Sequence, residues 1–273
     1  MGKSPKKLDQ RNLIRYFIFT YILFWALLGL TGFLISVEVP AAIQTIMKNV
    51  CAWTPTFVLL LMFKRLYPTT NLRDFLRDHL LSKTKFRYFV LAFLLQAAIF
   101  VGTVAAYLVL NKLRLESITV ISVSSLIPTI LITATSGVTG EELGWRAYAL
   151  NVYQKRHSPL KSALFVGLVW GFWHLPLMIL SGYSGIELFY YCFSFMVAIL
   201  SVSIIITYFY NKGRSVLIAM WIHFLFNFSL TLVTIDLLQL LIYLSAGYLL
   251  LAIILFITQK RELLEIPAQF EER

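Results

Sequence analysis

The residues of this sequence best placed to do chemistry are ionisable side chains set inside long apolar runs. Glu141, Glu142 and Arg146 form an EExxxR motif. On a helix, Glu142 and Arg146 lie four residues apart and face each other, so we predict an ion pair between them. Glu141 points about 100° away around the helix. It is therefore left outside that pair, as a general base or a metal ligand must be.

Two histidines follow in similar apolar surroundings. His174 lies four residues after Trp170 in WGFWHLP, and His223 lies four residues before Asn227. Each pair presents one polar face on an otherwise apolar helix, and Pro176 predicts a disturbed helix next to His174. An ionisable side chain in a bilayer costs roughly 2.5–3.5 kcal/mol on insertion scales, so these residues need a structural or functional reason.

The elements that position these motifs are apolar runs of roughly 20 residues, the length that crosses a bilayer. They predict an all-α membrane bundle of about eight spans, namely Tyr16–Ser36, Ala41–Phe63, Tyr88–Leu110, Ile118–Gly140 with a helical continuation, Ser162–Leu180, Leu188–Tyr210, Val216–Val233 and Leu237–Ile257. A short helix over Asn71–Leu81 is predicted to lie on the inner membrane surface. We expect one integral membrane domain over 1–273, with a motif-bearing core at about 118–233.

Composition and charge support a membrane protein. Hydrophobic residues make up 59% of the chain and charged residues 14%, whereas soluble domains carry about 25% charged residues. Twenty Lys and Arg residues fall on one predicted side of the bundle and only Lys112 and Arg114 on the other, which places both termini in the cytoplasm. The net charge of +11 comes from cations between apolar runs, so we expect contacts with membrane lipids and no nucleic acid partner.

The motifs are predicted to meet at one depth. At the helical rise per residue, Glu141, His174 and His223 lie roughly 21, 20 and 14 Å along their helices from the nearest cytoplasmic cations. Hydrogen bonds that merely hold the bundle together are one alternative, and a proton relay or transporter is another. Ser184 stands in a GxSG sequence and Asp236 is a lone aspartate near a predicted span. Both fall at the outer ends of helices, where a turn and contact with water are the simpler interpretation.

The three motifs EELGWRAYAL, WGFWHLP and HFLFN, in this order, resemble the CPBP family. This family, also called Abi, contains type II CAAX prenyl endopeptidases and bacteriocin-processing or self-immunity proteins. Its pattern is EExxxR, FxxxH and HxxxN or HxxxB, and the resemblance covers about residues 126–230. Trp170 stands where the pattern usually has Phe, and Ala147 where many members have Gly.

The resemblance implies an eight-helix intramembrane protease that cleaves a membrane-associated peptide or a prenylated protein. The sequence shows no organelle-retention signal, so we expect a prokaryotic plasma membrane. The resemblance also implies a water activated by Glu141 and His174, an oxyanion stabilised by His223 and Asn227, and a site organised by Glu142 and Arg146. A carboxylate shielded from bulk water is an effective base, and donors in a dry site stabilise developing charge strongly. The alternative is a bacteriocin self-immunity or scaffold protein that acts by binding.

The sequence leaves the cofactor open. Glu141, His174 and His223 match a known catalytic zinc set of two histidines and one glutamate. No HExxH motif is present. We favour a metal-free mechanism because Asn227 and Arg146 suit the stabilisation of an oxyanion and the organisation of the site.

Overall fold

The fold of this chain is all-α, as predicted. The computed structural model describes residues 5–81 and 84–267, where the one feature of β type is an isolated antiparallel bridge between Val120 and Val233. The first half comprises α1 (Pro5–Ser36), α2 (Ala41–Ala52), α3 (Thr54–Leu66), α4 (Leu72–Leu80), α5 (Phe86–Leu110), η1 (Leu115–Ser117) and α6 (Val123–Thr133). The second half comprises η2 (Ala134–Val138), α7 (Thr139–Glu142), η3 (Leu143–Leu150), α8 (Asn151–Gln154), α9 (Pro159–Trp173), α10 (Leu175–Ile179), α11 (Gly185–Gly213), α12 (Val216–Ser229), α13 (Leu237–Thr258) and α14 (Lys260–Leu264).

Several helices are long and apolar enough to cross a membrane, which makes this a multi-pass membrane protein. In the described residues there are five such stretches, Asp9–Ser36, Phe86–Leu110, Val123–Gln154, Gly185–Gly213 and Leu237–Thr258, and a sixth if the bent pair α2 and α3 is one span. The shorter apolar helices α9 and α12 have 15 and 14 residues. A crossing needs about 20 residues, so the count of eight stays a prediction.

Two of the predicted spans are broken rather than continuous. The run predicted as Ala41–Phe63 bends by 52° between α2 and α3, where Pro55 follows at the start of α3 and lacks the N–H that a continuing helix requires. The run predicted as Ser162–Leu180 stops at His174, and α10 begins immediately after it with Pro176 in its first turn. The helix disturbance predicted from Pro176 is thus confirmed, and it falls at the histidine itself.

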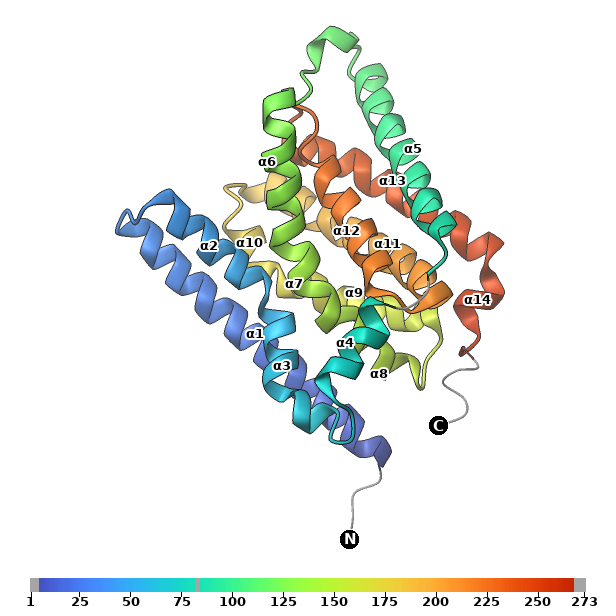
Figure 1. Cartoon of the computed structure of the whole chain (residues 1–273). Helices are drawn as coiled ribbons and strands as arrows, with labels where there is room; N and C mark the ends of the chain where they lie inside the picture. Colours follow the sequence, from blue (N-terminus) through green and yellow to red (C-terminus); the bar gives the residue numbers. More distant parts are fainter. Residues whose placement is uncertain (1–4, 82–83, 268–273) are drawn as a thin grey trace.

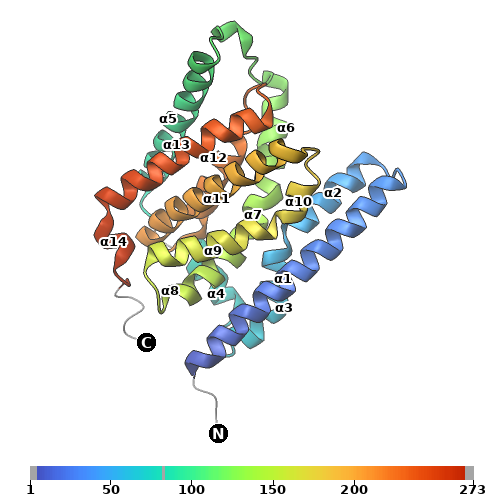
Figure 2. The ribbon, with the colours of Figure 1, turned by 180° about the vertical axis from the view of Figure 1, so that it is seen from behind.

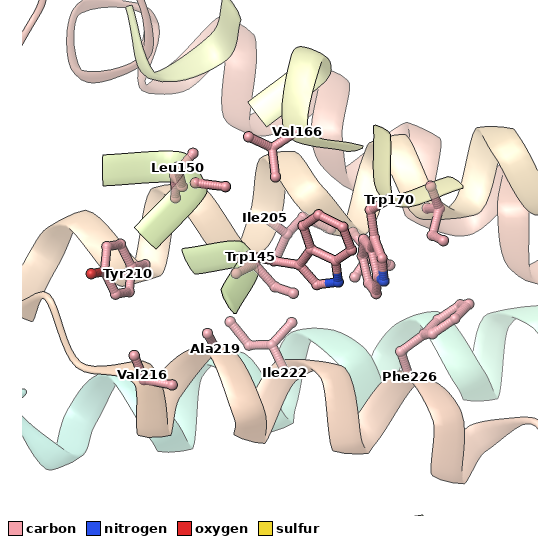
Figure 3. Close-up of a cluster of buried hydrophobic side chains, with 14 of the residues drawn as sticks. Trp145, Leu150, Val166, Trp170, Ile205, Tyr210, Val216, Ala219, Ile222 and Phe226 are labelled. Atoms are coloured by element: carbon pink, nitrogen blue, oxygen red, sulfur yellow. The ribbon is translucent and has the colours of Figure 1, made fainter. Parts of the chain in front are cut away.

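The bundle is centred on α11, which packs against α9, α12 and α13. Figures 1 and 2 show α1 and α2 along one flank and α5 with α13 along the opposite flank. A cluster of buried apolar side chains fills the centre, with Trp145 and Trp170 facing Ala219 and Ile222 of α12 (Figure 3). Outward-facing side chains on the flanks are also apolar, for example Val101 at 65% exposure, which a bilayer accommodates and water does not.

The beginning of α1 and helix α14 lie at the same end of the bundle, and η1 lies at the opposite end (Figures 1 and 2). An even number of crossings gives this arrangement. Of the twenty cations that predict cytoplasmic termini, Lys3, Lys83 and Arg273 lie outside the described residues. The orientation of the chain in the membrane remains a prediction from charge.

The short helix predicted over Asn71–Leu81 is present as α4, and Asn71 caps it by accepting a hydrogen bond from the backbone N–H of Arg73. It does not simply rest on a membrane surface, because Phe75 is buried and packs edge-on against Phe63 at 5.4 Å. The apolar face of α4 is therefore partly buried against the protein's own core.

Candidate active site

The EExxxR motif lies in a helix of unusual geometry. The long stretch Val123–Gln154 contains two π-helical segments, η2 and η3, on either side of α7, and Ser136 interrupts the first with a non-helical ψ of −124°. Such π segments, in which the hydrogen bonds run from i to i+5, are frequent at functional sites. Glu141 and Glu142 lie on α7 between the two segments, and both are buried.

The ion pair predicted from the spacing of the EExxxR motif is confirmed. Arg146 Nε donates to Glu142 Oε2 at 2.9 Å, and both side chains are 0% exposed. Arg146 Nη1 also donates to Ser203 Oγ at 3.0 Å, and Ser203 Oγ donates in turn to the Ala163 carbonyl at 2.8 Å. No motif predicted a role for Ser203, which joins α9, α11 and η3 through one side chain.

The second oxygen of Glu142 holds a histidine from a distant part of the chain. His223 Nδ1 lies 2.8 Å from Glu142 Oε1, although 81 residues separate them. A carboxylate at Nδ1 keeps the proton on that nitrogen and fixes the ring orientation. Glu142 therefore does more than pair with Arg146, because it also orients His223 and leaves the Nε2 atom available to other groups.

Trp170 contacts several of the predicted site residues. Its Nε1 donates to Glu141 Oε2 at 2.5 Å, and its ring lies 5.1 Å from the His223 ring and 4.9 Å from Arg146 Cζ. The residue spacing predicted that Glu141 would lie outside the pair of Glu142 and Arg146, but it did not predict this hydrogen bond from Trp170. A phenylalanine at this position would have no N–H to donate, so the departure from the family pattern adds a hydrogen bond to Glu141.

His174 lies at the break between α9 and α10. Its Nδ1 is 2.9 Å from the Trp170 carbonyl, and its ring contacts Trp173 at 4.7 Å and Phe195 at 5.2 Å between ring centres. A backbone carbonyl accepts only from a protonated nitrogen, which leaves the Nε2 lone pair available. The helix break thus provides the backbone acceptor for His174 Nδ1.

Asn227 lies one turn beyond His223 on α12 and is partly buried. Among the described residues its side chain has no hydrogen bond, so it is not part of the linked cluster formed by the other five predicted residues. Asp236 has a structural role, because it caps α13 by accepting from the Gln239 N–H at 3.0 Å. Ser184 precedes α11 as its N-cap residue.

The residue types of Glu141, His174 and His223 suit zinc binding, but their positions in the structure do not. Histidines that bind zinc usually give their other ring N–H to a carboxylate or carbonyl, and His223 and His174 both do so here. Within residues 5–81 and 84–267, however, no three His, Cys, Asp or Glu side chains are grouped closely enough to hold a metal ion. We therefore derive no step through zinc.

Gly137 allows the close approach on which Glu141 depends. A Cβ placed on Gly137 would overlap Glu141 Oε1 and lie 3.6 Å from His223 Cε1. We expect Gly137→Ala to displace the Glu141 carboxylate and to lower the free energy of unfolding by about 1–3 kcal/mol, as overpacking does. Thermal unfolding in detergent checks this. Gly102→Ala is the matched control because nothing lies within 4 Å of its Cβ, and equal melting temperatures of the two variants would contradict the prediction.

The part of the chain that contains this cluster is similar to a known protein family. Residues 122–229 match the family model described as Type II CAAX prenyl endopeptidase Rce1-like. The resemblance predicted from the three motifs is thereby confirmed. This segment is similar to that family. It contains all six predicted site residues, and it begins after α5.

A curated relative agrees with the family model. CAAX prenyl protease 2 of Methanococcus maripaludis is 38% identical to this chain over 102 residues. The alignment covers 36% of this chain and 38% of the relative, so the chain matches less than half of that protein's length. The family match itself covers residues 122–229, so helices α1 to α5, α13 and α14 lie outside it.

Proposed function

We propose that this protein is an intramembrane endopeptidase of the CAAX type, which uses a water activated by Glu141 and His174. The observation that carries the proposal is the linked, buried cluster in which Trp170 holds Glu141 and Glu142 holds His223. A cluster that served only to join helices would not need two carboxylates in adjacent positions, because each additional buried charge is costly.

In the proposed reaction, Glu141 accepts a proton from the water as it attacks the peptide carbonyl. Its Oε1 oxygen is the acceptor, since Oε2 already receives the hydrogen bond from Trp170. His174 holds the same water through its Nε2 lone pair, because its Nδ1 proton is given to the Trp170 carbonyl. The proton then passes from Glu141 to the leaving amine, which completes the cleavage.

His223 and Asn227 are proposed to donate hydrogen bonds to the oxyanion of the tetrahedral intermediate. For Nε2 of His223 to donate, the ring must carry two protons. The Glu142 carboxylate at Nδ1 stabilises that imidazolium, as a carboxylate beside a catalytic histidine does. Arg146 keeps Glu142 ionised and in place, and each donor at such a site is worth roughly 3 kcal/mol.

The proposed substrate is a membrane-associated peptide. We favour a prenylated protein, because the similar protein is named CAAX prenyl protease 2. A site among apolar helices admits such a chain from the bilayer, and we place the protein in a prokaryotic plasma membrane. The competing function is bacteriocin self-immunity or scaffolding by binding. It predicts no cleavage of any peptide and no dependence on Glu141.

Cleavage assays with purified protein in detergent test the proposal. Matched fluorogenic peptides with and without a farnesyl group on the same cysteine are offered to the wild type, His174→Ala and Glu187→Ala, the last of which changes an exposed glutamate outside the site. We expect the wild type and Glu187→Ala to cleave the farnesylated peptide and His174→Ala to lose at least about 10²-fold in rate, the range of an acid–base group. Absence of cleavage by the wild type would favour the binding function.

The same purified protein can be used to test whether cleavage requires zinc. We expect cleavage to survive a zinc chelator and metal analysis to find less than one zinc per protein. Loss of activity in chelator, with recovery on adding zinc, would overturn the metal-free mechanism and assign Glu141, His174 and His223 as ligands that move together on binding the ion.

A further inference from the structure

The junction between α2 and α3 contacts the part of the chain that carries Glu141. Trp53 is the residue at this junction, where the two helices bend by 52°. Its indole Nε1 donates to the backbone carbonyl of Thr135 at 2.9 Å, although 82 residues separate them. Helix α2 packs against η2, and α3 packs against α7 and η3 (Figure 1). Helices α2 and α3 therefore reach the site although they lie outside the family match at residues 122–229.

Two glycines allow this contact to be close. A Cβ on Gly140 would lie 2.6 Å from Cδ1 and Cγ of the Trp53 ring and 2.8 Å from the Trp53 Cα. A Cβ on Gly144 would overlap the Tyr16 hydroxyl and lie 2.7 Å from Pro55 Cβ. The Tyr16 hydroxyl in turn donates to the Pro55 carbonyl at 3.0 Å. The junction therefore lies directly against the backbone of α7 and η3, and close-packed interiors of this kind transmit displacements.

The segment that Trp53 contacts is irregular. Thr135 lies in η2 directly before Ser136, whose ψ of −124° interrupts the helix. Where a helix is interrupted, its regular backbone hydrogen bonds are disturbed, and its carbonyls need partners from elsewhere. Trp53 provides such a partner for the Thr135 carbonyl. The conformation of η2 therefore depends in part on a side chain from outside the segment.

The same segment contacts Glu141. A Cβ on Gly137, two residues after Thr135, would overlap Glu141 Oε1. This is the oxygen that accepts the proton from water in the proposed reaction, since Trp170 already donates to Oε2. A movement of η2 therefore changes the position or the surroundings of the oxygen that acts as the base.

We propose that Trp53 is a positioning residue for Glu141. Through its hydrogen bond to the Thr135 carbonyl, Trp53 holds η2 in the conformation that places Glu141 Oε1 to accept a proton from water. This inference rests on the proposed function, in which Glu141 is the base. The Nε1 proton of Trp53 is already given to Thr135, so Trp53 acts through η2 and its removal should change kcat rather than KM.

Cleavage kinetics of the whole protein in detergent test the proposal, with a farnesylated fluorogenic peptide as substrate. Trp53→Phe removes the N–H and keeps an aromatic ring beside Gly140. We expect kcat to fall by about tenfold with KM unchanged, because a misplacement of about 1 Å can cost ~10²-fold in rate. The control is Trp25→Phe, which changes a tryptophan of α1 that is 46% exposed and should keep the wild-type rate. A kcat of Trp53→Phe within about twofold of the wild type, or a change in KM alone, would overturn the proposal.

A double variant separates positioning of the base from a general loss of structure. In the Glu141→Gln background the base is already absent, so Trp53→Phe should lower the residual rate no further. An equal loss in both backgrounds would show that Trp53 only stabilises the fold, and would overturn the proposal.

Hydrogen exchange measured by mass spectrometry gives a readout that does not require activity. In Trp53→Phe the backbone amides of residues 134–142 should exchange about fivefold faster than in the wild type, the effect of losing one hydrogen bond of average strength. Trp25→Phe should leave them unchanged, and unchanged exchange in Trp53→Phe would overturn the proposal. If the wild type cleaved no peptide, the proposed function and the role of Trp53 in catalysis would both be overturned. Faster exchange in Trp53→Phe would then still show that Trp53 holds η2, so the two failures are distinguishable.

Discussion

Glu141→Gln is expected to lower kcat/KM for peptide cleavage by about 10³-fold, within the range for loss of a general base. The glutamine amide oxygen can still accept the hydrogen bond from Trp170 Nε1, which now reaches Glu141 Oε2 at 2.5 Å. The substitution therefore removes the ability to accept a proton from water while the packing around Trp170 is kept. Cleavage of a farnesylated fluorogenic peptide in detergent measures the effect.

The control for this prediction is Glu187→Gln, which changes an exposed glutamate near the beginning of α11. It should cleave at the wild-type rate, and both variants should melt at nearly the same temperature. If Glu141→Gln retained more than a tenth of the wild-type kcat/KM, Glu141 would not be the base. The site assignment would then move to another member of the cluster.

Arg146→Ala is expected to lower the free energy of unfolding by about 3–5 kcal/mol. Removing one partner of a buried ion pair leaves the other as an uncompensated charge, and Glu142 and Arg146 are both fully buried. The substitution also releases Ser203, to which Arg146 donates at 3.0 Å. Unfolding of the purified protein by heat or by a denaturing detergent measures the loss.

The chain contains a matched control in Arg261, which pairs with Glu265 at 3.0 Å with the same spacing of four residues. That pair is 86% and 64% exposed, so Arg261→Ala should leave the melting temperature unchanged, as is usual for surface ion pairs. A second test is the double variant Glu142→Gln with Arg146→Met, which removes both charges. It should recover part of the stability lost in Arg146→Ala, and no recovery would contradict the uncompensated charge as the cause.

The membrane class, the all-α fold and the pairing of Glu142 with Arg146 could all be predicted from the amino-acid sequence. These follow from short-range rules, because apolar run length indicates a helix that can cross a bilayer and a spacing of four places two side chains on one face. The disturbed helix near His174 also followed, since proline lacks the N–H that a continuous helix needs. Each of these features depends on residues that are close together in the chain.

Which atoms of the site contact one another could not be predicted from the sequence and is seen in the folded chain. Trp170 donates to Glu141 across 29 residues and His223 donates to Glu142 across 81. Such contacts depend on how each helix is rotated and where it breaks. The π segments around α7, the stop of α9 at His174 and the bend between α2 and α3 set these rotations. Although prolines predict some of the breaks, residue spacing does not encode how the helices are rotated against one another. That rotation depends on how side chains of separate helices pack into the same buried volume.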